Sequence, residues 1–160
     1  MSTTDPRVAA AAVLDPELRV VTIDELGILR DVRREDGTGR LIVTITPTYT
    51  GCPAMDVIRS DIRSALAAAG HPDAEIRTVY APAWTTDWIS DSGRAKLAAA
   101  GIAPPSPARR SGPVPLTLAV RCPLCGSPDT EQLSRFGSTA CKSLWRCRAC
   151  REPFDHLKAL

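Results

Sequence analysis

The sequence Cys122-Pro-Leu-Cys125, followed after 21 residues by Cys147-Arg-Ala-Cys150, decides how the C-terminal part of this chain folds. Each Cys-x-x-Cys pair places two thiolates on one tight turn, and two such turns complete a tetrahedral shell around a metal ion. The residues between the pairs include the segments 130–136 and 142–146, which predict the strands of a zinc ribbon. A module of about 40 residues buries little apolar surface, so we expect bound metal to supply most of its folding free energy.

The spacing of these four cysteines leaves the identity of the metal open. We expect Zn²⁺ in a structural site, because four protein ligands leave no open coordination position. Four thiolates also hold a single iron ion or an iron–sulfur cluster, which is the alternative at the same residues. Cys141, shortly before the second pair, is a candidate extra cluster ligand, although its more common role would be that of a small buried residue.

Composition and cysteine placement limit the class of protein. Of 160 residues, 44% are hydrophobic and 24% charged, as in a globular protein, and no apolar run is long enough to predict a membrane span. Five of the 6 cysteines fall in the last 39 residues, and the N-terminus shows no export signal. A disulfide framework needs an oxidising compartment, so we expect metal binding and a cytoplasmic location, with no membrane partner.

Charge and proline content divide the chain. Residues 1–105 carry 11 basic against 14 acidic side chains, and residues 106–160 carry 9 against 4. Four thiolates around a divalent ion carry a charge of about −2 together, which leaves the second part only mildly basic. Five of the 14 prolines lie within residues 102–115, which predicts an extended spacer. The predicted domains are residues 1–103, a linker at 104–116 and a four-cysteine module at 117–160.

The first domain is predicted to be a small α+β domain with a mixed sheet, in the order α-β-β-α-β-α. The residue before a proline is pushed out of helical geometry, so the first helix should end at Asp15-Pro16. Residues 35–39 have the composition of a hairpin turn, and apolar residues three to four apart predict the long second helix. The expected elements are a helix opened by Asp5-Pro6 and running through 8–14, strands 27–33 and 40–46, helix 53–69, strand 75–80 and helix 92–100.

Cys52 is the candidate reactive residue of this domain. It follows Gly51 and precedes Pro53 at a predicted helix start, where the helix dipole favours a thiolate. Such a thiol suits a transient metal ligand or a nucleophile, and equally a capping or core cysteine. Asp15-Pro16-Glu17 offers two carboxylates at a chain break, either as part of a site or as solvated acids at a helix stop.

Several motifs together resemble a known family. Asp15-Pro16-Glu17, Leu26-Gly27-Ile28 and the segment 46–53, Thr-Pro-Thr-Tyr-Thr-Gly-Cys-Pro, resemble the SufT-like domain of iron–sulfur and metallocofactor assembly proteins. Three further segments narrow this resemblance. They are the segment around Trp84 and Trp88, the segment before the second cysteine pair, and residues 152–158. This combination is similar to the accessory D-subunit family encoded with the bacterial phenylacetyl-CoA epoxidase, over residues 8–160.

The resemblance implies a function for the chain. A member of this family would be a non-catalytic accessory subunit of a di-iron, ring-epoxidising monooxygenase in phenylacetate catabolism. It would aid maturation or insertion of iron or an iron–sulfur cluster into a partner, and its partners would be the other epoxidase subunits. Cys52 would then be the transient ligand or reactive thiol, with Asp15 and Glu17 shaping the same site.

Two alternatives stand beside this hypothesis. A zinc-ribbon nucleic-acid binder would use the arginines near the ribbon, but the small net charge and few aromatic residues disfavour nucleic acid as a partner. A thiol oxidoreductase would use Cys52 or one Cys-x-x-Cys pair and would need free cysteines of low pKa.

Overall fold

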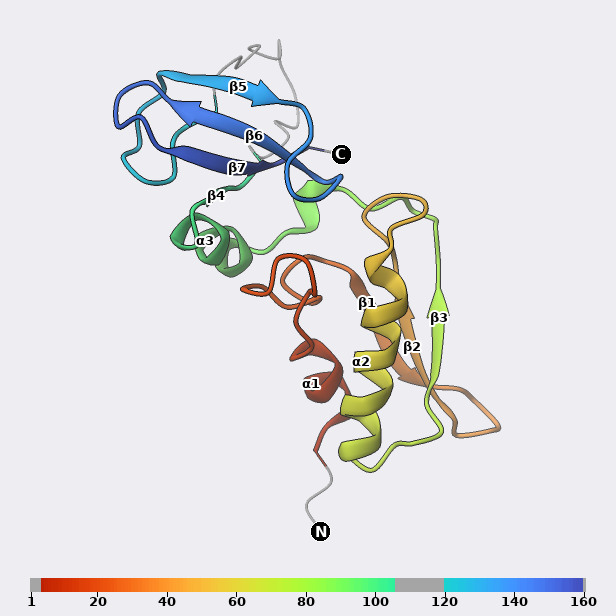
Figure 1. Cartoon of the computed structure of the whole chain (residues 1–160). Coiled ribbons are helices and arrows are strands. Elements are labelled where there is room, and N and C mark those ends of the chain that lie inside the picture. Colours follow the sequence, from red (N-terminus) through yellow and green to blue (C-terminus); the bar gives the residue numbers. More distant parts are fainter. Residues whose placement is uncertain (1–3, 106–119, 160) are drawn as a thin grey trace. The chain divides into compact units, whose positions relative to one another are not determined.

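The computed structural model describes residues 4–105 and 120–159, which separate into two compact units at Gly93/Arg94 (Figure 1). This division falls within the last helix of the first part of the chain, α3 (Asp91–Ala99). The predicted linker 104–116 lies for most of its length outside the described residues, so its bounds remain a prediction. Within the described ranges, no helix combines the length and the apolar character that a membrane crossing requires.

The first unit has the predicted α+β architecture around a mixed sheet. In its sheet, β1 pairs antiparallel with β2, and β2 pairs parallel with β3. A parallel pair needs a crossover connection, and α2 supplies it between β2 and β3. The elements are α1 (Pro6–Ala11), β1 (Leu29–Arg34), β2 (Leu41–Ile45), α2 (Ala54–Ala68), β3 (Glu75–Thr78) and the 3-10 helix η1 (Thr86–Trp88), followed by α3.

The core of the first unit lies where α2 and β2 bury their apolar side chains. The side chains of Ile58, Ile62 and Leu66 recur at every fourth residue and are fully buried, as the sequence pattern predicts. On β2, Ile42, Val43 and Ile45 are equally buried, and Val43 lies between Val32 of β1 and Ile76 of β3 in the register. α1 packs against α2 and β1.

The first helix is shorter than predicted. α1 ends at Ala11, because the chain then forms an antiparallel bridge between Leu14 and Thr22. The N–H of Asp15 donates to the carbonyl of Val21 at 3.0 Å, and the N–H of Ile23 donates to Val13 at 2.9 Å. These bonds replace the helical ones and turn residues 15–21 into a loop.

The two tryptophans of the segment after β3 pack onto the loop that precedes β1. The indole N–H of Trp84 donates to the carbonyl of Leu26 at 2.8 Å, and this ring is buried. Gly27 has φ 73°, and a Cβ there would lie 2.6 Å from the Cβ of Trp88, so only glycine fits. The Arg30 guanidinium lies 3.6 Å from the centre of the Trp88 ring. Both aromatic residues therefore serve packing.

The second unit is a four-stranded sheet in the order β4-β7-β6-β5. The three long strands pair antiparallel, and the short β4 pairs parallel with β7. The two predicted ribbon strands are present as β5 (Thr130–Ser134) and β6 (Lys142–Cys147), whereas β4 (Ile102–Ala103) and β7 (Pro153–Leu157) were not predicted. A small core of Ala103, Cys122, Trp145, Cys147 and Phe154 lies on one face of this sheet.

Candidate functional site

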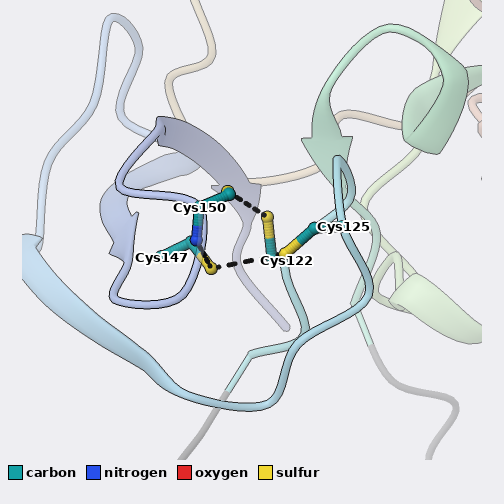
Figure 2. A group of neighbouring side chains, drawn as sticks. All are labelled: Cys122, Cys125, Cys147 and Cys150. Carbon is teal, nitrogen blue, oxygen red and sulfur yellow. Dashed lines mark hydrogen bonds between the residues drawn. The ribbon is translucent and has the colours of Figure 1, made fainter.

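The four cysteines of the second unit meet at one point (Figure 2). Their sulfur atoms all lie within 4.8 Å of one another. The Sγ atoms of Cys125 and Cys147 are 3.5 Å apart, and those of Cys122 and Cys150 are 3.8 Å apart. All four thiols are free, because a disulfide needs a sulfur–sulfur distance of about 2.0 Å. Each close contact therefore joins one cysteine of the first pair to one of the second.

The two cysteine turns have the same backbone construction. In each, the N–H of the first cysteine donates to the carbonyl five residues later, at 3.0 Å in both turns. The residue after each second cysteine adopts a left-handed conformation, with φ 75° at Gly126 and φ 66° at Arg151. Glycine takes this conformation without strain, whereas arginine rarely does. The glycine at position 126 indicates this turn in the sequence, whereas the arginine at position 151 does not indicate the equivalent turn.

This arrangement fits a single metal ion. Ligands at a Zn–S distance of about 2.3 Å on a tetrahedron lie about 3.8 Å from each other. The two sulfur–sulfur distances across the pairs, 3.5 and 3.8 Å, are close to that value. Several metal atoms inside the shell would force the sulfurs further apart. The second unit therefore contains a four-cysteine metal site whose geometry suits a mononuclear ion.

The protonation of these thiols is strongly perturbed. The backbone N–H of Cys150 lowers the pKa of Cys147 to about 7, with help from the neighbouring thiols. The pKa of Cys150 rises to about 12, because burial and the adjacent sulfurs outweigh the opposing N–H of Glu152. Thiols this close cannot all be negative unless a cation balances their charge. All four thiols can therefore be ionised together only when a metal cation is bound between them.

Cys141 lies outside this group of sulfurs. Its side chain is buried, and its Sγ lies 3.0 Å from the hydroxyl oxygen of Thr139 in the turn before β6. Its carbonyl accepts from the N–H of Lys158 at 2.9 Å. The structure thus gives Cys141 contacts of its own, within the packing of the β5–β6 connection.

The arginines beside the metal site are paired with an acid. Arg146 and Arg148 both donate to the carboxylate of Glu131 on β5, Arg148 at 3.1 Å. Hydrogen bonds from Arg146 and then Arg148 lower the pKa of Glu131. The positive charge on which the nucleic-acid alternative depended is therefore partly neutralised.

Cys52 lies in the first unit, in the loop between β2 and α2. Its side chain is half-buried, and the preceding Gly51 has φ 82°. α2 begins at Ala54, one residue later than predicted, with Pro53 in the N-cap position. The carbonyl of Tyr49 accepts from the N–H of Cys52 at 3.3 Å, which closes a tight turn before the helix.

The expected thiolate character of Cys52 is corrected by the structure. Burial is the largest effect and raises the pKa of this thiol above its usual 9.0, and the negative charge of Glu17 adds to the rise. The N–H of Ala54 at the helix start lowers the pKa, as expected from the helix dipole, but is outweighed. The charge of Asp15 acts in the same direction as that of Glu17, and the Tyr49 side chain acts against both. The thiol is therefore mainly protonated near neutral pH.

The two carboxylates of the Asp15-Pro16-Glu17 motif lie near Cys52 but have different surroundings. Asp15 is 6% exposed, and its Oδ1 accepts from the N–H groups of Glu17 and Leu18 at 2.9 and 2.8 Å. Glu17 is half-buried and affects the pKa of Cys52 more than Asp15 does. Asp15 therefore holds the turn that presents Glu17. The sequence suggested both acids but did not indicate Tyr49, which only the closure of the loop brings near the thiol.

Comparison with known proteins now defines the family. The chain is 44% identical over 146 residues to the putative D subunit of the 1,2-phenylacetyl-CoA epoxidase of Escherichia coli K12, covering 91% of this chain and 86% of that protein. Residues 107–158 match the model of the PaaD zinc beta ribbon domain, and residues 7–79 match that of iron–sulfur cluster assembly proteins. The chain belongs to the PaaD family.

More distant relatives match little more than half of this PaaD-family chain. The Fe-S protein maturation auxiliary factor YitW of Bacillus subtilis is 36% identical over 83 residues, covering 51% of this chain and 79% of that protein. A crystal structure of a domain of unknown function, DUF59, from Bacillus anthracis shares 30% identity with a TM-score of 0.51. That match covers 59% of this chain and 90% of the other. The PaaD family thus joins an iron–sulfur assembly domain to a zinc ribbon.

Proposed function

We propose that this chain is a non-catalytic accessory subunit of a phenylacetyl-CoA epoxidase system, in which it aids the insertion of iron or an iron–sulfur cluster into a partner subunit. The observation that carries the proposal is a half-buried Cys52 close enough to Glu17 for that carboxylate to raise the thiol pKa, in a domain that matches iron–sulfur assembly proteins. The name of the Escherichia coli relative supports the epoxidase subunits as partners.

The chemistry of the Cys52 site suits a temporary ligand for iron as cargo. One thiol and one carboxylate are a small donor set, and carboxylate and thiolate are both iron ligands in proteins. Because the thiol pKa is raised, Cys52 carries its proton until a cation arrives and displaces it. Binding is then opposed by proton release, which favours handing the metal on. The same protonation makes Cys52 a poor nucleophile and disfavours a thiol oxidoreductase.

The four-cysteine site has the opposite character, and we propose Zn²⁺ as its resident ion. Cys122, Cys125, Cys147 and Cys150 would complete the shell. When bound, the metal supplies folding free energy and charge neutralisation at the four sulfurs. A shell filled by protein ligands leaves no position for a substrate, so the ribbon would stabilise its unit and present it to partner subunits.

The function is tested in cells that produce the epoxidase subunits with this chain or with a variant. The iron and acid-labile sulfide contents of the purified partner subunits are the measurement. We expect both to fall when the chain is absent or carries Cys52→Ser, and to remain normal with Cys141→Ser as the matched cysteine control. Fully loaded partners without the chain would contradict the maturation role.

A second arm separates maturation from catalysis. Epoxidase assembled with the chain and then freed of it is assayed for turnover of phenylacetyl-CoA. The proposal predicts unchanged turnover by loaded partner subunits, because the accessory chain acts before catalysis. Loss of turnover with unchanged iron content would instead indicate a direct part in the reaction.

A further inference from the structure

Thr46 is a buried polar residue at the point where the Cys52 loop leaves the sheet. It directly follows β2, and its side chain is 1% exposed. Its N–H donates to the carbonyl of Ile28 at 2.9 Å, and its hydroxyl donates to the carbonyl of Val79 at 2.6 Å. Ile28 directly precedes β1 and Val79 directly follows β3, so one residue joins the ends of all three strands.

The hydrogen bond from the Thr46 hydroxyl to Val79 adds to the backbone hydrogen bonds at this end of the sheet. The N–H of Val79 donates to the carbonyl of Ile45 at 2.9 Å, so the backbone on both sides of Val79 is tied to β2 and its extension. The Val79 carbonyl lies in a partly buried place, where the loss of its donor, the Thr46 hydroxyl, would leave it less well satisfied. The side-chain oxygen of Thr46 thus fixes the exit direction of the chain.

The Cys52 loop begins at this anchored end of β2. The thiol is six residues beyond Thr46, and its loop is fixed at the far end by the start of α2. Between these two ends, the bond from the Cys52 N–H to Tyr49 closes a turn within the loop itself and does not tie it to the sheet. The bonds of Thr46 therefore fix the loop at the end where it leaves the sheet.

We propose that Thr46 is a positioning residue, whose hydroxyl bond to Val79 holds the Cys52 thiol in its half-buried place beside Glu17. The proposal rests on the function proposed for Cys52 and adds the residue that keeps its geometry. Without the hydroxyl, the loop shifts outward, and the thiol becomes more exposed and more distant from the carboxylates. Each of these changes favours the thiolate.

The test follows the alkylation rate of Cys52 in the full chain against pH. Iodoacetamide is the probe, and peptide mass spectrometry reads Cys52 separately from the other cysteines. Thr46→Val keeps the shape of the side chain and removes the hydroxyl. We expect the pH profile of Cys52 alkylation in Thr46→Val to move to lower pH by about half a unit. This shift raises the thiolate fraction of Cys52 at neutral pH about threefold.

Two variants distinguish positioning from general loss of stability. Thr46→Ser retains the donor and should restore the profile of the unsubstituted chain. Thr44→Val makes the same chemical change two residues earlier on β2, at a hydroxyl without a hydrogen bond among the described residues, and should also leave the profile in place. A Thr46→Val profile that coincides with the unsubstituted one, or a Thr46→Ser profile that moves with Thr46→Val, would overturn the proposal.

This result is independent of cofactor delivery. If Thr46→Val shifts the profile while partner subunits load iron normally, the positioning role stands and the maturation role fails. If partner loading depends on Cys52 but the profile does not move, the maturation role stands and Thr46 has no part in it.

Discussion

The chain contains two cysteine sites built on opposite principles. In the second unit, four sulfurs lie within 4.8 Å of one another, and each is supplied by a local turn of the backbone. In the first unit, a single thiol lies near two carboxylates that come from a loop 35 residues earlier. The first arrangement retains an ion, because all its ligands are thiolates. On the proposed function the second would hold an ion weakly, because the pKa of its only thiol is raised.

The largest difference between the two sites should appear on removal of metal. Structural zinc in zinc-finger peptides supplies about 10–16 kcal/mol of binding free energy, which is also folding free energy, and we expect a comparable dependence here. We expect a strong chelator, or Cys147→Ser, to unfold the second unit and leave the first unit folded. Hydrogen exchange resolved by peptide measures both units in one sample.

The control for this prediction is Cys141→Ser, which removes a buried thiol of the same unit from outside the metal site. We expect its second unit to stay protected from exchange. Equal protection before and after chelation would contradict a metal-dependent fold.

The carboxylates of the Cys52 site offer the next largest effect. Asp15→Ala leaves the buried N–H of Leu18 without its acceptor, so we expect the first unit to lose about 1–3 kcal/mol in urea unfolding. Asp15→Asn keeps an oxygen acceptor and should cost clearly less. Glu17→Gln should leave stability nearly unchanged and lower the pKa of Cys52, since it removes a nearby negative charge. If Asp15→Ala and Asp15→Asn lose the same free energy of unfolding, the charge of Asp15 and not its hydrogen bonds would account for its contribution to stability.

The matching turns of the metal site allow a smaller, paired test. Gly126 and Arg151 occupy equivalent left-handed positions, with φ 75° and φ 66°. Gly126→Ala should therefore destabilise the second unit by about 1 kcal/mol, and Arg151→Gly should stabilise it by about 0.5 kcal/mol. Thermal unfolding of the metal-bound chain measures both. A stabilising Gly126→Ala or a destabilising Arg151→Gly would contradict the equivalence of the two turns.

The smallest effect concerns pH and His156 of β7. Burial lowers the pKa of His156 below its usual 6.5, while Nδ1 lies 3.2 Å from the hydroxyl of Ser143 and the ring lies edge-on to Trp145. As pH falls through 6.5 the unfolded chain takes up the proton first, so stability is lost until the pH is below the folded value. We expect His156→Gln to flatten this loss of stability as the pH falls through 6.5. An unchanged slope would assign the acid sensitivity to other groups.

The sequence predicted local features of this molecule far better than distant contacts. The four metal ligands were predictable because each pair forms one turn, and α2 because its apolar spacing is regular. β7 begins at Pro153 and contains a polar pair at residues 155 and 156, and β4 has two residues before a proline run, so neither shows a strand pattern.

The site in the first unit shows the same limit. Gly51-Cys52-Pro53 correctly suggested a thiol near a helix start, and the dipole effect is present in the N–H of Ala54. The predicted direction of the pKa shift was wrong because the burial of Cys52 and the influence of the Asp15 and Glu17 charges arise only when the chain folds. The bond from Thr46 to Val79 joins residues 33 apart and has no sequence signature.

The proposed division into one permanent and one transient metal site is tested most directly by measuring metal and acid-labile sulfide in the chain purified without oxygen. The same two contents are measured for the Cys52→Ser and Cys147→Ser variants. We predict about one zinc ion per chain and no sulfide, unchanged in Cys52→Ser and lost in Cys147→Ser. Iron with sulfide held by the four cysteines, or a resident metal that disappears with Cys52, would contradict that division.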